Sequence, residues 1–150
     1  MLESSLKNKI KRLIESRGGF WSAVKGGEYS KPGDTDIIAC YLGRYVAIEG
    51  KAATGKPSYD QEDCREWIRD AWGIHIYSYN LETVEKVLDG IKMDLDEEVR
   101  YTIAKDPEGF DGIEDVAVGY IAMGIRDAAD IRACIDSGIT PAEAWDIKYG

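Results

Sequence analysis

Residues 35–52, TDIIACYLGRYVAIEGKA, decide how the first half of the chain folds. Two runs rich in apolar residues, 35–42 and 45–52, lie on either side of Gly43-Arg44. Short apolar runs separated by a glycine-containing break are typical of two strands joined by a tight turn. The stretch therefore predicts a β-hairpin with its turn at Gly43 and Arg44.

Three charged side chains meet at the open end of this predicted hairpin. Side chains two positions apart in a strand point to the same face, so Glu49 and Lys51 are expected side by side. The hairpin brings Asp36 opposite Lys51 or diagonal to it, within roughly 5–8 Å. Two carboxylates this close repel each other unless a cation lies between them, and Mg²⁺ takes such ligands together with water and phosphate. A neighbouring lysine can stabilise phosphate charge, so the three residues suit phosphodiester hydrolysis.

The segments around the hairpin predict an α/β domain. The first segment has apolar residues at helical spacing and ends at Gly18-Gly19. Ser58 and Gln61 have the spacing of a capping box, which indicates the start of another helix. The expected elements are a helix up to about residue 17, strands at 20–25, 35–42 and 45–52, a helix at 59–71, a strand at 74–79 and a helix from Asn80 to about Leu88.

The composition changes near residue 90, where we place a domain boundary. Residues 1–60 carry a net charge of +3 and residues 61–150 a net charge of −12, so the total of −9 is unevenly spread. Residues 91–150 form an acidic, mainly helical appendage by this prediction. Gly124-Ile125 and Gly138-Ile139 each precede an alanine-rich segment, a weak helical repeat of only two copies.

The spacing of the charged residues resembles a known nuclease signature. Asp36, followed thirteen residues later by Glu49-Gly50-Lys51, is similar to the PD-(D/E)xK motif and, more narrowly, to the VRR-NUC (virus-type replication-repair nuclease) domains. Gly33 and Asp36 match the glycine-x-proline-aspartate element, with threonine in place of the proline, although Asp34 competes for the position of Asp36. The resemblance covers roughly residues 1–90 and also matches Glu3 on the first helix and Gln61 on the next one.

The resemblance implies a restriction-endonuclease-like core and a metal-dependent DNA endonuclease. Asp36 and Glu49 would bind Mg²⁺ or Mn²⁺, and Glu3 would complete the metal site. Lys51 would activate water or stabilise the phosphate, and Gln61 would support the site. Such domains act on structured DNA, such as junctions or flaps, often as homodimers, and a phage or prophage origin suits the compact size.

Basic residues flank the predicted site and give it a possible DNA-binding surface: Lys7, Lys11, Lys25, Lys31 and Lys56. Such a spread would hold the DNA backbone without reading bases. For any one of these lysines, an ordinary solvated surface is the competing interpretation.

Each candidate also has a purely structural interpretation. Glu49 and Lys51 alone would make a surface ion pair, and Gln61 is fully explained as a capping residue. Core packing is the default for Trp67 and Trp72, as for Trp21, although they could stack on bases. The lone His75 is expected to be packed in its strand.

A second function class is also open. A nuclease fold that has lost catalysis could use its acidic part to bind a basic protein partner, or to mimic DNA. Within the nuclease reading, residues 91–150 could instead serve autoinhibition or dimer contact. Calorimetric titration with metal separates the two classes.

The remaining features predict an intracellular protein. Cys40, Cys64 and Cys134 are odd in number and outside any metal-binding pattern, which favours reduced thiols. No apolar run approaches the length of a membrane span, so we expect a cytoplasmic protein of a bacterial or phage-infected cell.

Overall fold

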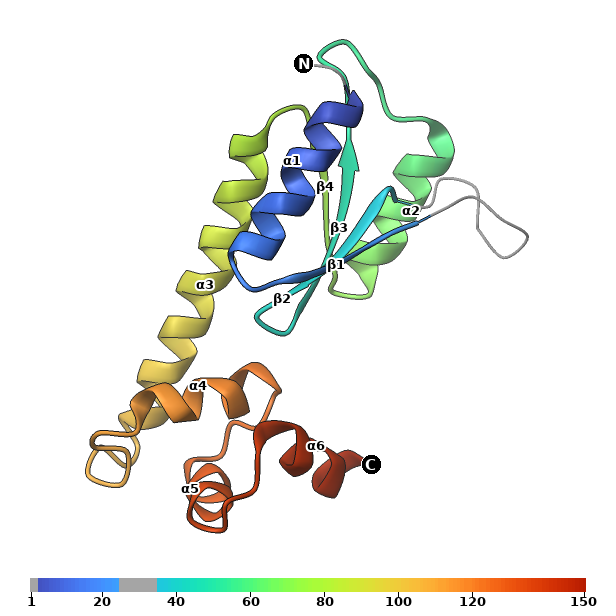
Figure 1. Cartoon of the computed structure of the whole chain (residues 1–150). Helices are drawn as coiled ribbons and strands as arrows, with labels where there is room; N and C mark the ends of the chain where they lie inside the picture. The colour runs from blue at the N-terminus through green and yellow to red at the C-terminus, as the bar shows by residue number, and fades with distance from the viewer. Residues whose placement is uncertain (1–2, 25–34) are drawn as a thin grey trace. The chain divides into compact units, whose positions relative to one another are not determined.

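The computed structural model describes residues 3–24 and 35–150. The chain forms two compact units, Met1–Asp89 and Gly90–Gly150. The described residues fold into a four-stranded mixed sheet, in the first unit, and six helices (Figure 1). The α/β class expected from the sequence is confirmed at this level.

The sheet has its strands in the order of the chain: β1 (Phe20–Ala23), β2 (Ile37–Tyr41), β3 (Arg44–Gly50) and β4 (Ile74–Ser78). The first three strands are antiparallel neighbours, whereas β4 runs parallel to β3. A parallel neighbour needs a crossover connection, and α2 (Tyr59–Asp70) supplies it.

The hairpin turn lies one residue earlier than the sequence suggested. Tyr41 pairs with Arg44, so Leu42 and Gly43 form the turn, with φ angles of 48° and 80°. Two-residue hairpin turns with positive φ at both positions match the right-handed twist of the strands. The predicted turn at Gly43-Arg44 is therefore wrong, and a shift of one residue in the turn changes every cross-strand partner.

One face of the sheet is closed. Figure 1 shows α1 (Glu3–Ser16) and the start of α3 (Leu81–Ile103) on the same side of the strands. α1 buries a stripe of Leu6, Ile10 and Ile14 at helical spacing. The core of this closed face consists of that stripe together with Ile37, Ala39, Val46, Ile48, Val84 and Leu88.

The opposite face, which carries Ile38, Tyr45, Ala47, Glu49, His75 and Tyr77, is only partly covered, and we call it the open face. α2 lies on this side and contacts β4, yet none of its residues is buried (Figure 1). Trp67 and Trp72 are 59% and 93% exposed, so the prediction that they pack in the core is wrong. The apolar stripe of α2 faces a cavity beside the sheet instead of a filled interior.

The third helix is longer than the sequence indicated. α3 continues past Leu88 and Gly90 to Ile103, because no helix-breaking residue follows and the apolar stripe of Ile91, Leu95 and Val99 remains buried. A salt bridge from Lys92 to Asp96, one helical turn apart, adds support on the exposed side. The predicted end at Leu88 is wrong, since a glycine inside a helix costs only about 1 kcal/mol.

The second unit continues with α4 (Glu114–Ala122), α5 (Ala128–Asp136) and α6 (Pro141–Tyr149). Gly124 and Gly138 follow α4 and α5 with positive φ, and the next residue, an isoleucine in each case, donates its amide back into the last turn. The weak repeat seen in the sequence therefore corresponds to two helices that end in the same way. Within the described residues, no helix has the length and apolar character needed to cross a membrane.

Candidate active site

The centre of the candidate site is Glu49, the next-to-last residue of strand β3. Its side chain is buried, with the residue only 4% exposed. Oε2 accepts a hydrogen bond from the backbone amide of Asp36 at 3.2 Å, and Oε1 accepts one from Nε2 of Gln61 at 2.9 Å. A buried carboxylate is costly unless it is hydrogen-bonded, so these two contacts fix its orientation.

The register of the hairpin explains why Asp36 reaches Glu49. Ile37 pairs with Ile48, and continuing this pairing by one residue places Asp36 opposite Glu49. The sequence had placed Asp36 opposite or diagonal to Lys51, and the difference comes from the turn at Leu42-Gly43. The two carboxylates that were expected to share a site are thus direct cross-strand neighbours.

Gln61 links the helix to the strand through both ends of its amide. Nε2 donates to Glu49, while Oε1 accepts a hydrogen bond from Nζ of Lys51 at 2.7 Å. The same Oε1 accepts from the amide of Ser58, whose Oγ accepts from the amide of Gln61. The capping box is confirmed, and the structure shows that Gln61 both begins α2 and holds the two charged side chains.

Lys51 completes this group from just beyond the end of β3. Its backbone amide donates to the carbonyl of Ser78 at 2.8 Å, which anchors it to β4. Its Nζ lies 3.8 Å from Oε1 of Glu49, and its side chain is largely buried. The ammonium is therefore held at one side of the Glu49 carboxylate, with Gln61 bridging the two.

Lys7 takes a position that the sequence did not assign to it. Its Nζ lies 2.8 Å from Oε1 of Glu3 and 2.8 Å from Oδ2 of Asp36. Burial lowers the pKa of Lys7, but its contacts with Asp36 and Glu3 outweigh that effect and raise the pKa above its usual value. Lys7 is thus a cation between two of the predicted metal ligands; the Glu3-to-Lys7 spacing of one helical turn was the available signal.

The surroundings of Glu49 disfavour the charged form of its carboxylate. Burial, foremost, and the negative charge of Asp36 together raise the pKa of Glu49 to about 7, against the opposing effect of the Lys51 charge. Two neighbouring acids in a poorly solvated place cannot both ionise without cost. A cation bound between them would remove that cost.

These observations fit a divalent metal held by Asp36 and Glu49. Mg²⁺ is usually bound by one or two carboxylates, with water and phosphate supplying the remaining oxygen ligands. Within residues 3–24 and 35–150, no three His, Cys, Asp or Glu side chains are grouped closely enough to hold a metal ion. Glu3 reaches the pair only through Lys7, so the third ligand implied by the resemblance is not brought together with the other two.

The other lysines assigned to DNA lie in different situations. Lys11 stacks over the ring of Trp21, with its Nζ 4.8 Å from the ring centroid. Lys56 is exposed in the loop between β3 and α2. Lys25 and Lys31, like Gly33 and Asp34 of the nuclease-like element, lie outside the described residues.

His75 is packed, as the sequence suggested. It is 3% exposed on β4 and stacks edge-to-face with Tyr77. Burial, with the charges of Arg65 and Arg69 adding to it, lowers the pKa of His75 to about 4.

Comparison of this chain with family models, curated proteins and solved structures gives no match to any of them.

Proposed function

We propose that the protein is a metal-dependent endonuclease that hydrolyses DNA phosphodiester bonds. The order of elements in the first unit supports a restriction-endonuclease-like core, the finer fold implied by the resemblance to VRR-NUC domains. One observation carries the proposal: Glu49 and Lys51, two residues apart at a strand end, are joined to each other by Gln61, and Glu49 contacts Asp36.

Each residue has a task that suits its surroundings. Asp36 and Glu49 would hold Mg²⁺ or Mn²⁺. The resemblance adds Glu3, which here is linked to Asp36 through Lys7. A bound divalent metal supplies positive charge to the phosphate and lowers the pKa of a coordinated water. Lys51 would stabilise the negative charge that grows on the phosphate, at a fixed place where no reorganisation is needed. Gln61 would keep the carboxylate and the ammonium apart and aligned.

The test uses Glu49→Gln and Lys51→Ala, each with a matched control. Junction, flap, single-stranded and linear duplex DNA are incubated with the full chain, with and without Mn²⁺. Loss of a group that stabilises the transition state is expected to lower cleavage by roughly 10²–10³-fold. Glu82→Gln and Lys86→Ala, an exposed ion pair on α3, should leave cleavage unchanged.

Circular dichroism and thermal melting of all four variants show whether they are folded. Activity of Glu49→Gln equal to that of the wild type, after repeated purification, would reject the proposal. Preference for junctions or flaps over linear duplex supports the structure-selective form of the function.

A second candidate function follows from the charge distribution. Residues 61–150 carry a net charge of −12, which suits a basic protein partner. In this alternative the site is catalytically silent and the fold serves as a binding or regulatory module. Calorimetry with Mn²⁺ discriminates: the silent form shows no binding that depends on Asp36 and Glu49, whereas the endonuclease does.

A further inference from the structure

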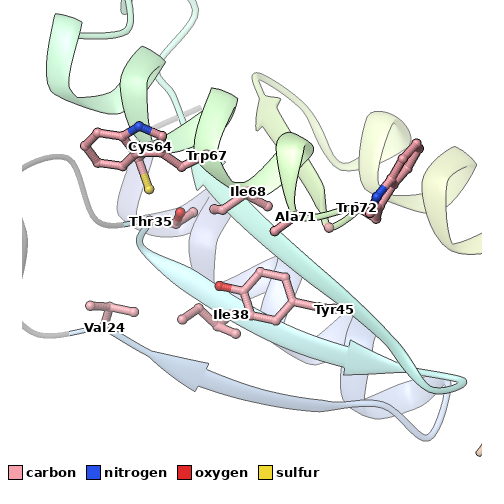
Figure 2. A pocket seen from close by; sticks show the side chains of 10 residues that line it. Val24, Thr35, Ile38, Tyr45, Cys64, Trp67, Ile68, Ala71 and Trp72 are labelled. Atoms are coloured by element: carbon pink, nitrogen blue, oxygen red, sulfur yellow. The ribbon is translucent and has the colours of Figure 1, made fainter.

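A cavity of about 520 Å³ opens between α2 and the open face of the sheet. Figure 2 shows Trp67 and Ile68 reaching toward it from α2, and Tyr45 and Ile38 from the strands, with Thr35 between them. Cavities of this volume, lined mainly by apolar and aromatic side chains, are typical of sites for small rings. The volume exceeds that of the packing defects found in protein interiors.

The side chains around the cavity are unusually exposed for their type. Trp67 is 59% exposed and Tyr45 46%, and α2 buries none of its residues. Trp72, which follows α2, has a φ of 63°, a left-handed conformation that costs a non-glycine residue roughly 1–2 kcal/mol. The conformation of Trp72 belongs to the end of α2, where the amide of Gly73 donates back to the carbonyl of Ile68. Packing among the described residues leaves the exposure of Trp67 and Tyr45 unexplained, and a ligand on this aromatic rim would account for it.

The cavity adjoins the candidate active site along two elements. Thr35 precedes Asp36 in the chain, and Cys64 lies one helical turn after Gln61. The near end of the cavity is thus separated from Gln61 by a helical rise of about 4.5 Å. One nucleotide of a strand rises by about 3.4 Å, so a neighbouring nucleotide is within reach of the cavity.

We propose that this cavity takes an unpaired nucleobase of the strand whose phosphodiester meets Glu49 and Lys51. The inference rests on the proposed function and names its substrate class: DNA with an unpaired nucleotide next to the cut. A base inside a duplex is stacked and paired on both sides, so only an unpaired or extruded base can enter such a cavity. Aromatic rings accept any base, because every base has a π-face.

The chemistry of the lining favours a neutral ring over other ligands. Among the described residues that line the cavity there is no lysine, arginine, aspartate or glutamate. These described residues offer a phosphate no cation, whereas they offer an uncharged base apolar contacts and the hydroxyl of Thr35. The acidic residues of α2 outnumber its arginines, Arg65 and Arg69, so the helix disfavours a second phosphate nearby and leaves the strand's backbone on the side of Lys51.

The first experiment measures how strongly a bound oligonucleotide protects Cys64 from alkylation, in a metal-free buffer where the proposed cleavage cannot occur. In a Cys40→Ser/Cys134→Ser chain, Cys64 is the remaining thiol, and its alkylation by iodoacetamide is followed in EDTA. A thymidine oligonucleotide at ten times its dissociation constant should slow alkylation roughly tenfold. A fully paired duplex of equal length should leave the rate unchanged, and so should a tenfold rise in protein concentration.

The second experiment measures affinity for flap and blunt duplex DNA in the same metal-free buffer. Trp67→Ala should weaken binding of the flap by roughly tenfold, the loss expected for one stacked base. It should not change binding of the blunt duplex. Trp145→Ala, which alters a half-exposed tryptophan of the second unit, is the matched control and should change neither.

The results separate this inference from the endonuclease proposal. Protection of Cys64 by the oligonucleotide without any metal-dependent cleavage rejects the enzyme and keeps the base site. Cleavage that depends on Glu49, with Cys64 alkylated at one rate in all conditions, rejects only the base site. The base site is also rejected if blunt duplex protects Cys64 as well as the oligonucleotide does, because the occupant is then duplex DNA. It is rejected too if a higher protein concentration alone protects Cys64, because the occupant is then a second copy of the chain.

Discussion

The two faces of the sheet differ in how completely a helix covers them. On the closed face, α1 inserts Leu6, Ile10 and Ile14 into the core with no measurable exposure for two of them. On the open face, α2 has an equally clear apolar stripe but buries none of it. Amphipathic sequence therefore identifies a helix without saying whether its stripe will be filled. Here the filled face holds the fold together, and the unfilled face carries the carboxylates, the lysine and the cavity.

The largest expected loss of stability comes from a substitution in the core of the closed face. Ile10→Ala removes a fully buried side chain and should lower the free energy of unfolding by about 2–5 kcal/mol. Trp67→Ala on the open face, although it deletes more atoms, should cost less than about 1 kcal/mol because Trp67 is already exposed. Urea unfolding followed by circular dichroism measures both. Similar losses would mean that α2 is packed as firmly as α1.

His75 is one of the buried side chains on the open face, and its burial keeps it neutral. Its pKa in the folded protein, about 4, lies below the usual 6.5, so the unfolded chain binds more protons between these two values. Stability should therefore fall as the pH drops from about 6.5 to 4, by about 3 kcal/mol from this residue. Arg65 and Arg69 face His75 and add to the shift.

The measurement compares wild type with His75→Leu across this range, because Glu49 acts in the opposite direction. Its raised pKa makes the folded state gain stability as the pH falls from about 7 toward 4.5. The difference between the two proteins isolates His75. A constant difference at all pH values would show that His75 does not titrate with folding.

Lys7 lies where α1, which covers the closed face, meets the candidate site. Lys7→Met removes the ammonium between Glu3 and Asp36 but keeps the aliphatic stem that lies against Gly50. Without this competing cation, Mn²⁺ should bind roughly tenfold more tightly in calorimetry. The same titration on Glu49→Gln should show weaker binding. Weaker binding in Lys7→Met as well would mean that the lysine assists the metal instead of competing with it.

The smallest effect concerns how the helices end. α1, α4 and α5 are followed by a glycine with positive φ, whereas α2 is followed by Trp72 in that conformation. Trp72→Gly should therefore raise the free energy of unfolding by up to about 1 kcal/mol, as the strain is removed. Trp72→Ala keeps the strained backbone and should give no gain. Stabilisation by both variants would point to the exposed indole, not the backbone, as the source of the cost.

The sequence allowed prediction of whatever depends on neighbouring residues. The glycines that end the first helix, the apolar runs of the strands and the capping box at Ser58 are local signals, and each appears in the structure. The turn at Leu42-Gly43 was missed because a leucine with positive φ has no distinctive sequence pattern. That one residue decided the cross-strand partner of Asp36.

Properties that depend on distant packing could not be predicted. The exposure of Trp67 follows from how far α2 stands from the sheet, and its sequence looks the same in either case. The length of α3 depends on partners for Ile91, Leu95 and Val99 that periodicity alone does not reveal. The position of Lys7 between two carboxylates required the spatial meeting of α1 with the start of β2.

Gln61 makes the geometry of the candidate site depend on local order in α2. One amide group both starts α2 and spaces Glu49 from Lys51, so the helix cannot lose its first turn while the charged pair stays aligned. Fraying at this helix end would release the carboxylate and the ammonium together, long before the molecule as a whole unfolds. Any partner that tightens or loosens those few residues would thereby change the alignment of Glu49 with Lys51, without touching the charged groups themselves.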